Sequence, residues 1–128
     1  MPDFDIIVIG SGAFGSSTAY HLSKTGKKVL VLDRFHPPHD KGSSHGQTRV
    51  IREAYFENPI YVPLLQRSYQ LWTNLEMASG KELLIKTGGL MLGKRDSHVA
   101  TGTLESARSN NLTCELLTST EIKNKFPA

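Results

Sequence analysis

Three glycines near the N-terminus constrain the fold of this chain more than any other feature. Gly10, Gly12 and Gly15 form the pattern G-x-G-x-x-G, directly between the apolar run Phe4–Ile9 and a segment of helical character over residues 13–24. Gly10 permits a tight turn, Gly12 lets a pyrophosphate approach the backbone, and Gly15 lets helix and strand pack without a Cβ between them. The pattern predicts a strand, turn and helix that bind a dinucleotide.

The flanking residues complete a β-α-β unit. We expect Phe4–Ile9 and Lys28–Leu32 to be strands buried on both faces of a parallel sheet, and the helix over residues 13–24 to end at Gly26. Asp33 follows the second strand, where its carboxylate can accept hydrogen bonds from the adenosine ribose, while the amides of the helix N-terminus face the phosphates. The alternative is a glycine-rich turn without a nucleotide. The triplet and Asp33 do not separate FAD from NAD.

The remaining chain predicts a loop, helices and short strands. Residues 35–46 have the prolines, glycines and serines of a loop, whereas Thr48–Phe56 favours a strand. An amphipathic helix is expected over Pro59–Ala78, stopped by Ser79-Gly80, and after it two strands, Leu83–Thr87 and Leu90–Leu92, joined through Gly88-Gly89. A helix over Ser97–Asn110 and a strand at Cys114–Leu117 follow. A last helix begins with a Thr118/Glu121 capping box and is ended by Pro127. Tyr61, Tyr69 and Trp72 are interpreted as packing residues of the first of these helices.

Composition disfavours several classes of function. The net charge of +3 comes from Lys and Arg spread along the chain, so we expect no nucleic-acid partner. Cys114 is the single cysteine, and the histidines are interpreted as separate surface or loop residues without paired ligands for a metal site. Neither a signal peptide nor an apolar run of membrane-spanning length is evident. These features predict a cytoplasmic protein without a membrane partner, or a peroxisomal one if it is eukaryotic.

A second motif lies at Gly42–Glu53, which reads GSSHGQTRVIRE. It places hydroxyls, an imidazole and a guanidinium on a glycine-flanked loop that suits phosphate and the edge of a flavin ring. The residues concerned are Ser43, Ser44, His45, Thr48 and Arg49. The alternative is a polar surface loop with solvated charges, since most charged residues are exposed.

This motif, with YVPLLQRSYQLW, KTGGLMLG and EIKNKFP after it, resembles the monomeric sarcosine oxidase family, which includes N-methyltryptophan oxidase and peroxisomal sarcosine/pipecolate oxidase. The resemblance covers essentially the entire chain. It implies an α/β fold: the Rossmann-like, FAD-binding β-α-β start of a two-domain flavoprotein, followed by the beginning of an antiparallel-sheet substrate domain. The implied domains are residues 1–80 and residues 81–128, and the chain is expected to be truncated relative to the family.

The resemblance also implies roles for individual residues. Arg49 would lie near the isoalloxazine and His45 beside the flavin, as the catalytic residues of this stretch. Arg52 matches the arginine that holds the substrate carboxylate, which a guanidinium can do through two parallel hydrogen bonds. The expected FAD-binding residues are Gly10, Gly12, Ala13, Phe14, Gly15, Asp33, Arg34, Ser43, Ser44, Thr48 and Arg49.

The implied reaction is flavin-dependent oxidation of an N-methyl or cyclic secondary amino acid, with reduction of oxygen to hydrogen peroxide. The partners are then a small amino acid and dioxygen, and the exposed apolar edge of an incomplete sheet predicts self-association. Two alternatives stay open: an NAD(P)-dependent dehydrogenase, which shares the glycine pattern, and a catalytically inactive nucleotide-binding fragment.

Overall fold

The computed structural model describes residues 3–127, which form two compact units. The first unit ends at Arg49 and the second begins at Val50. This division falls between the two arginines that the second motif singles out. The expected domain boundary after residue 80 concerns the domains of a complete flavoprotein and stays a prediction.

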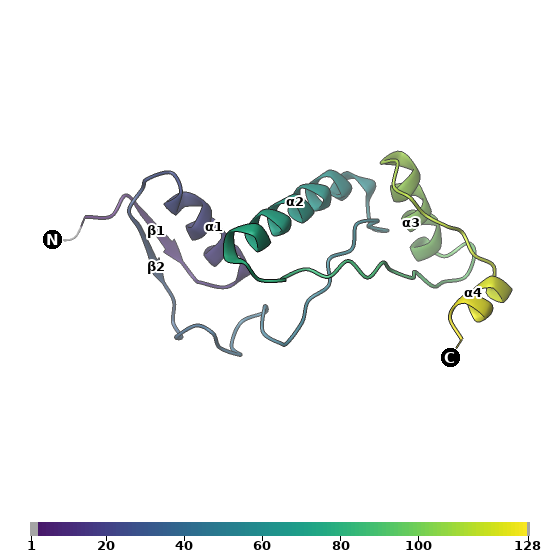
Figure 1. The fold of residues 1–128 in the computed structure, drawn as a ribbon, viewed down its shortest axis with the longest axis horizontal. Helices are drawn as coiled ribbons and strands as arrows, with labels where there is room; N and C mark the ends of the chain where they lie inside the picture. Colours follow the sequence, from purple (N-terminus) through teal and green to yellow (C-terminus); the bar gives the residue numbers. More distant parts are fainter. Residues whose placement is uncertain (1–2, 128) are drawn as a thin grey trace. The chain divides into compact units, whose positions relative to one another are not determined.

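The first unit is the predicted β-α-β unit. Strand β1 spans Ile6–Ile9, helix α1 spans Ala13–Ser23 and strand β2 spans Val29–Leu32. The two strands pair in parallel, from Ile6 opposite Val29 to Ile9 opposite Leu32. Helix α1 contacts both strands (Figure 1). Because a parallel pair needs a crossover between its strands, the helix and the pairing follow from the same segment of sequence.

The predicted burial of these strands on both faces is wrong. Side chains of β1 alternate between half-buried and exposed, and Ile7 and Ile9 are 57% and 87% exposed. Helix α1 covers only one face of the two-stranded sheet, so every second side chain of β1 remains uncovered. In β2 the two last residues, Val31 and Leu32, are exposed. Each strand also has an unpaired edge in the described residues, as expected, because the sheet contains only β1 and β2 there.

Residues 35–46 form a loop, as predicted, but Thr48–Phe56 does not form the predicted strand. Val50 is 85% exposed, and the amide of Tyr55 donates to the carbonyl of Glu53 in a local turn. A strand requires a neighbour with which to form a ladder, and none is available to this segment in residues 3–127. The β-branched composition alone therefore misled the prediction.

The second unit is helical. A 3₁₀ turn, η1, spans Pro59–Tyr61, and helices α2, α3 and α4 span Val62–Ser79, His98–Ser109 and Ser119–Lys125. Gly80 ends α2 in the left-handed conformation at φ 66°. Thr118 and Glu121 form the predicted capping box of α4. The predicted helices and their end signals are thus confirmed.

The strands predicted at Leu83–Thr87, Leu90–Leu92 and Cys114–Leu117 are absent from the described residues, and these segments form no antiparallel sheet there. Gly88 does adopt a positive φ, of 73°. The amides of Leu83 and Leu84 donate to the Glu76 carboxylate, at 2.7 and 2.9 Å, instead of to a neighbouring strand. Apolar alternation indicates where a strand fits, but pairing depends on a partner outside the segment.

The core of the second unit lies where α3 meets η1 and the residues before it. Its buried residues, all between α2 and the end of α3, are Val62, Gly102, Ser106 and Ala107. The other apolar side chains of α2 are at most half-buried, as at Leu65 and Leu71, and Leu64 and Met77 are 68% and 73% exposed. None of the helices within residues 3–127 has the length and apolar composition to cross a bilayer.

Candidate functional site

The glycine turn has the geometry that the sequence predicts for Gly10 and Gly15. Gly10 has a φ of 93°, and its amide donates to the Leu32 carbonyl at 2.6 Å. A Cβ on Gly15 would overlap the carbonyl oxygen of Gly10 and lie 2.8 Å from its carbonyl carbon. At Gly12 an added Cβ would meet no atom within 4 Å. The turn therefore requires glycine at its first and third positions, and leaves open space at the second.

The N-terminus of α1 can bind an anion. No side chain caps this terminus, and its first turn contains no acidic residue. Ala13 begins the helix, and the Phe14 side chain is 93% exposed. Free first-turn amides and the positive end of the helix dipole together favour a phosphate. These features fit the pyrophosphate of a dinucleotide.

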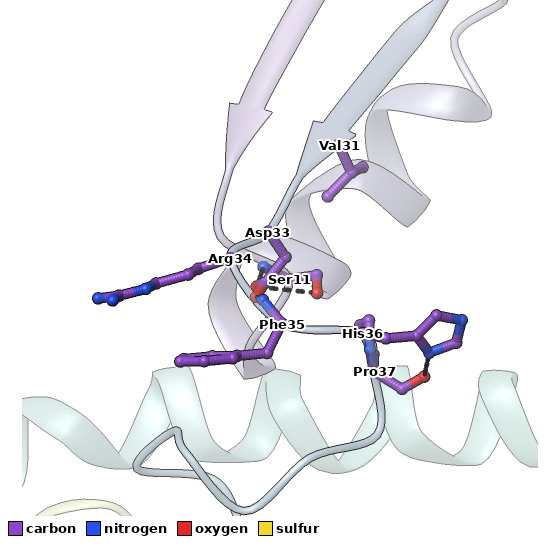
Figure 2. A pocket seen from close by; sticks show the side chains of 7 residues that line it. All are labelled: Ser11, Val31, Asp33, Arg34, Phe35, His36 and Pro37. Atoms are coloured by element: carbon purple, nitrogen blue, oxygen red, sulfur yellow. Dashed lines mark hydrogen bonds between the residues drawn. The ribbon is translucent and has the colours of Figure 1, made fainter.

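Asp33 connects the end of β2 to the glycine turn (Figure 2). Its Oδ2 accepts from the amide of Ser11 at 2.6 Å and from the Ser11 hydroxyl at 3.0 Å, while Oδ1 accepts from the amide of Phe35 at 2.9 Å. His39 Nε2 lies 3.4 Å from Oδ1. The amide of Phe35, then Ser11, holds the pKa of Asp33 well below its ordinary value. The carboxylate therefore stays ionised and organises the turn.

A cavity of about 450 Å³ opens beside this carboxylate (Figure 2). Its lining residues are Ser11, Val31, Asp33, Arg34, Phe35, His36 and Pro37. Asp33 and Arg34 were expected here, whereas the role of Ser11 was missed. The available signal was its position between Gly10 and Gly12, which places a short hydroxyl side chain opposite the end of the second strand.

The second motif folds into a compact loop around Arg49. Its guanidinium donates to the carbonyls of Thr48, at 2.7 Å, and Ser43, at 3.3 Å. Gly46 has a φ of 114°, and a Cβ there would lie 2.9 Å from Arg49 Nη1. His45 Nδ1 lies 2.5 Å from the Gly42 carbonyl, so Nδ1 carries the proton that it donates. Ser43, Ser44, His45, Thr48 and Arg49 are thereby gathered in one exposed loop of the first unit.

Arg52 begins a separate cluster in the second unit. Its Nη2 lies 3.2 Å from Glu57 Oε1, and its guanidinium lies 4.6 Å from the Tyr55 ring centroid and 5.2 Å from that of Phe56. Tyr55, and after it Glu57, stabilises the charged form and raises the pKa of Arg52 above its ordinary value. Sequence reasoning missed all three neighbours, although their aromatic and acidic side chains follow Arg52 within five residues. A guanidinium held on aromatic faces keeps its planar donors available to a carboxylate.

Next to this cluster lies an open, largely apolar groove of about 430 Å³. Its lining residues are Tyr55, Glu57, Tyr61, Leu64 and Leu65. Within residues 3–127, His, Cys, Asp and Glu side chains form no group of three that could hold a metal ion.

The model of the FAD-dependent oxidoreductase family matches residues 5–128. The chain belongs to this family. Membership confirms the resemblance drawn from the two motifs, and it implies a flavin cofactor.

Within this family, the chain is similar to oxidases of N-methyl amino acids. The chain is 48% identical over 126 residues to a monomeric sarcosine oxidase of Streptomyces avermitilis, covering 98% of this chain and 33% of that protein. It is 45% identical over 125 residues to a monomeric sarcosine oxidase of Bacillus sp., with 97% and 32% covered. It is 42% identical to an N-methyl-L-tryptophan oxidase of Yersinia pestis, with 98% and 34% covered. The chain therefore spans about a third of the length of these relatives.

Proposed function

We propose that this chain supplies the FAD-binding N-terminal part of an oxidase that acts on N-methyl or cyclic secondary amino acids and reduces oxygen to hydrogen peroxide. The observation that carries the proposal is the Arg52 cluster, because its charged, aromatic-backed guanidinium suits the carboxylate that such substrates share. The relatives named for oxidation of sarcosine and N-methyltryptophan support it. On this proposal residues 1–80 belong to the FAD domain, and residues 81–128 begin the substrate domain.

The first unit would hold the cofactor. The pyrophosphate would lie over Gly12, where the space is open, against the amides of Ala13, Phe14 and Gly15. A ribose hydroxyl would replace the Ser11 hydroxyl on Asp33, since the carboxylate has about four acceptor positions and its own chain already uses them. Arg34 lines the same cavity and would border the adenosine.

The Arg49 loop would meet the flavin. The hydroxyls of Ser43, Ser44 and Thr48 would bond to the ring edge and the phosphates. Arg49 would give up one of its hydrogen bonds to a loop carbonyl and donate to the flavin ring instead. Bound FAD would supply the redox chemistry, accepting a hydride equivalent from the substrate carbon and returning the electrons to dioxygen. Arg49 would favour negative charge on the ring through its positive charge, and His45, with Nδ1 committed to Gly42, would present Nε2 beside it.

Arg52 would bind the substrate carboxylate by exchanging Glu57 for it. The side chains of Arg52 and Glu57 are 36% and 41% exposed, so a small anion has access to the pair. An exposed ion pair contributes little stability, whereas a bidentate carboxylate adds a second hydrogen bond. The exchange is therefore favourable for a carboxylated amine. An amine without the carboxylate cannot replace Glu57 in this way.

The test compares Arg52→Ala and Arg52→Lys with wild type in the full-length protein. The rate of flavin reduction is measured against the concentration of an N-methyl amino acid and of its decarboxylated analogue. Arg52→Ala should weaken apparent affinity for the amino acid about ten- to two-hundredfold, from about 1.5 to 3 kcal/mol for a hydrogen bond to a charged group. Arg52→Lys should recover only part of this affinity because it lacks the planar fork.

Equal losses for the two compounds would mean that Arg52 supports the fold or the flavin, and would overturn its role in substrate binding. Membership of the FAD-dependent oxidoreductase family argues against the nicotinamide-dependent dehydrogenase. Flavin absorbance tests the other alternative, because an inactive fragment would bind flavin without reducing it in the presence of any amine.

A further inference from the structure

Side chains from two helices hold the backbone on both sides of Arg52. Tyr69 of α2 donates its hydroxyl to the carbonyl of Ile51 at 3.0 Å. Ser106 of α3 donates its hydroxyl to the carbonyl of Tyr55, 51 residues earlier in the chain. Residues 50–58 contain no helix or strand, so these bonds supply the partners that regular structure would otherwise provide.

One face of α3 fits closely against residues 55–59. Gly102, Ser106 and Asn110 recur every four residues and therefore share a face. A Cβ on Gly102 would overlap the Phe56 carbonyl oxygen and lie 3.2 Å from its Cα. Ser106 has no exposed surface, and Asn110 Nδ2 donates to the Pro59 carbonyl at 3.2 Å. The backbone that carries the partners of Arg52 is thus fixed at three consecutive points on α3.

Tyr69 is suited to remain a donor. Burial, followed by the negative charge of Glu53, raises the pKa of its phenol, which therefore keeps its proton at neutral pH. Its interpretation from sequence as a packing residue is incomplete, since its hydroxyl bonds to the residue directly before Arg52.

We propose that Tyr69 and Ser106 are positioning residues, which set where the Arg52 guanidinium meets the substrate carboxylate without touching the substrate themselves. The inference rests on the proposed function of Arg52. Its physical reason is that Tyr69 holds the backbone one residue before Arg52, while Ser106 holds Tyr55, whose ring lies under the guanidinium. Loss of either bond lets the guanidinium shift, and binding through two parallel hydrogen bonds tolerates little displacement.

The experiment uses Tyr69→Phe and Ser106→Ala in the full-length flavoprotein, each alone and in an Arg52→Ala background. With the N-methyl amino acid, each single variant should raise KM about three- to tenfold, the size expected for one lost neutral hydrogen bond. With the decarboxylated analogue, kcat/KM should not change. In the Arg52→Ala background, both variants should have no further effect on KM, because they act through the guanidinium.

Thr103→Val is the matched control. Thr103 lies on the same helix, and its hydroxyl is buried without a hydrogen-bond partner in the described part of the chain. Removal of this hydroxyl should leave KM unchanged for both the N-methyl amino acid and its decarboxylated analogue. The use of two variants guards the test against misfolding. If Ser106→Ala loses flavin, Tyr69→Phe still tests the positioning role, because it removes only a hydroxyl.

The outcomes separate the inference from the function on which it rests. If Arg52→Ala does not distinguish the two compounds, the proposed function fails. If it does, but Tyr69→Phe leaves KM unchanged, or raises it equally for both compounds, the positioning role is overturned. An effect of Tyr69→Phe that persists in the Arg52→Ala background would also overturn it.

Discussion

The two units hold their candidate functional segments in different ways. In the first, the glycine turn is fixed by neighbours in a single β-α-β unit: Gly10 bonds to Leu32, and Ser11 bonds to Asp33, 22 residues away. In the second, the residues around Arg52 depend on Ser106, which is 51 residues away from Tyr55 on another helix. A segment whose partners belong to one short motif can be read from its sequence, whereas one held by distant side chains cannot.

Two glycines make this comparison testable, because each faces a backbone carbonyl in its own unit. Gly15→Ala should have the largest effect of any single substitution in either segment. The new Cβ would overlap the carbonyl of Gly10, which is backbone and cannot move without opening the turn. We expect a loss of about 3 kcal/mol or more in the free energy of unfolding, together with loss of flavin. Thermal unfolding and the flavin-to-protein ratio measure the two effects.

Gly12→Val is its control, since Gly12 has a φ of −66° and no atom within 4 Å of an added Cβ. This variant should keep its thermal stability without cofactor and still fail to retain flavin, because the side chain fills the space proposed for the pyrophosphate. Normal flavin content in either glycine variant would remove the turn from the cofactor site.

Gly102→Ala should displace the backbone around Arg52 in the second unit and leave the glycine turn of the first unit unchanged. Its Cβ would press on the backbone of Phe56, and overpacking of this kind typically costs about 1 to 3 kcal/mol. Flavin occupancy should stay at the wild-type level, while KM for the N-methyl amino acid rises. The flavin-to-protein ratio and a titration of flavin reduction with substrate measure the two quantities. Loss of flavin in this variant would mean that the segments do not behave as separate sites.

Asp33→Asn should change how the stability of the first unit depends on pH. The folded-state pKa of Asp33 is lowered, so its stabilising contribution is complete above the ordinary carboxyl pKa of about 3.9 and is lost as pH falls through the lowered value. The variant should therefore bind flavin more weakly at neutral pH and lose less stability than wild type on acidification below about pH 4. Unfolding midpoints across that range provide the measurement. Asp40→Asn, which alters only the exposed pair with Lys41, should behave as wild type.

Thr118→Ala should have the smallest and most local effect. It removes the hydroxyl that caps α4 and accepts from the amide of Glu121 at 3.3 Å. A lost N-cap costs about 0.5 to 2 kcal/mol, here confined to one short helix. Hydrogen exchange of the α4 amides should accelerate while flavin content and KM do not change. A changed KM would show that the end of the second unit also contributes to the Arg52 segment.

The correct and incorrect predictions divide along the same physical difference. The β-α-β unit, the helices and the ends at Gly80 and Thr118 were predictable because turns and caps are completed by residues a few positions apart. The strands at Thr48–Phe56 and Leu83–Thr87 were not, because apolar, β-branched residues form a strand only beside a partner. The burial of β1 was wrong for the same reason, since it depends on what covers the sheet.

For the candidate site, the sequence predicted a dinucleotide at the glycine turn and Asp33, and phosphate or the edge of a flavin ring at the Arg49 loop. The family match supports the flavin cofactor, and the roles of the individual residues stay predictions. The bonds from Ser11 to Asp33, and from Tyr69 and Ser106 to the backbone around Arg52, became known from the folded chain alone. The reason is that the glycine turn and the helix caps are completed within one short motif. A hydroxyl on a helix acquires its carbonyl only after packing has brought distant segments together.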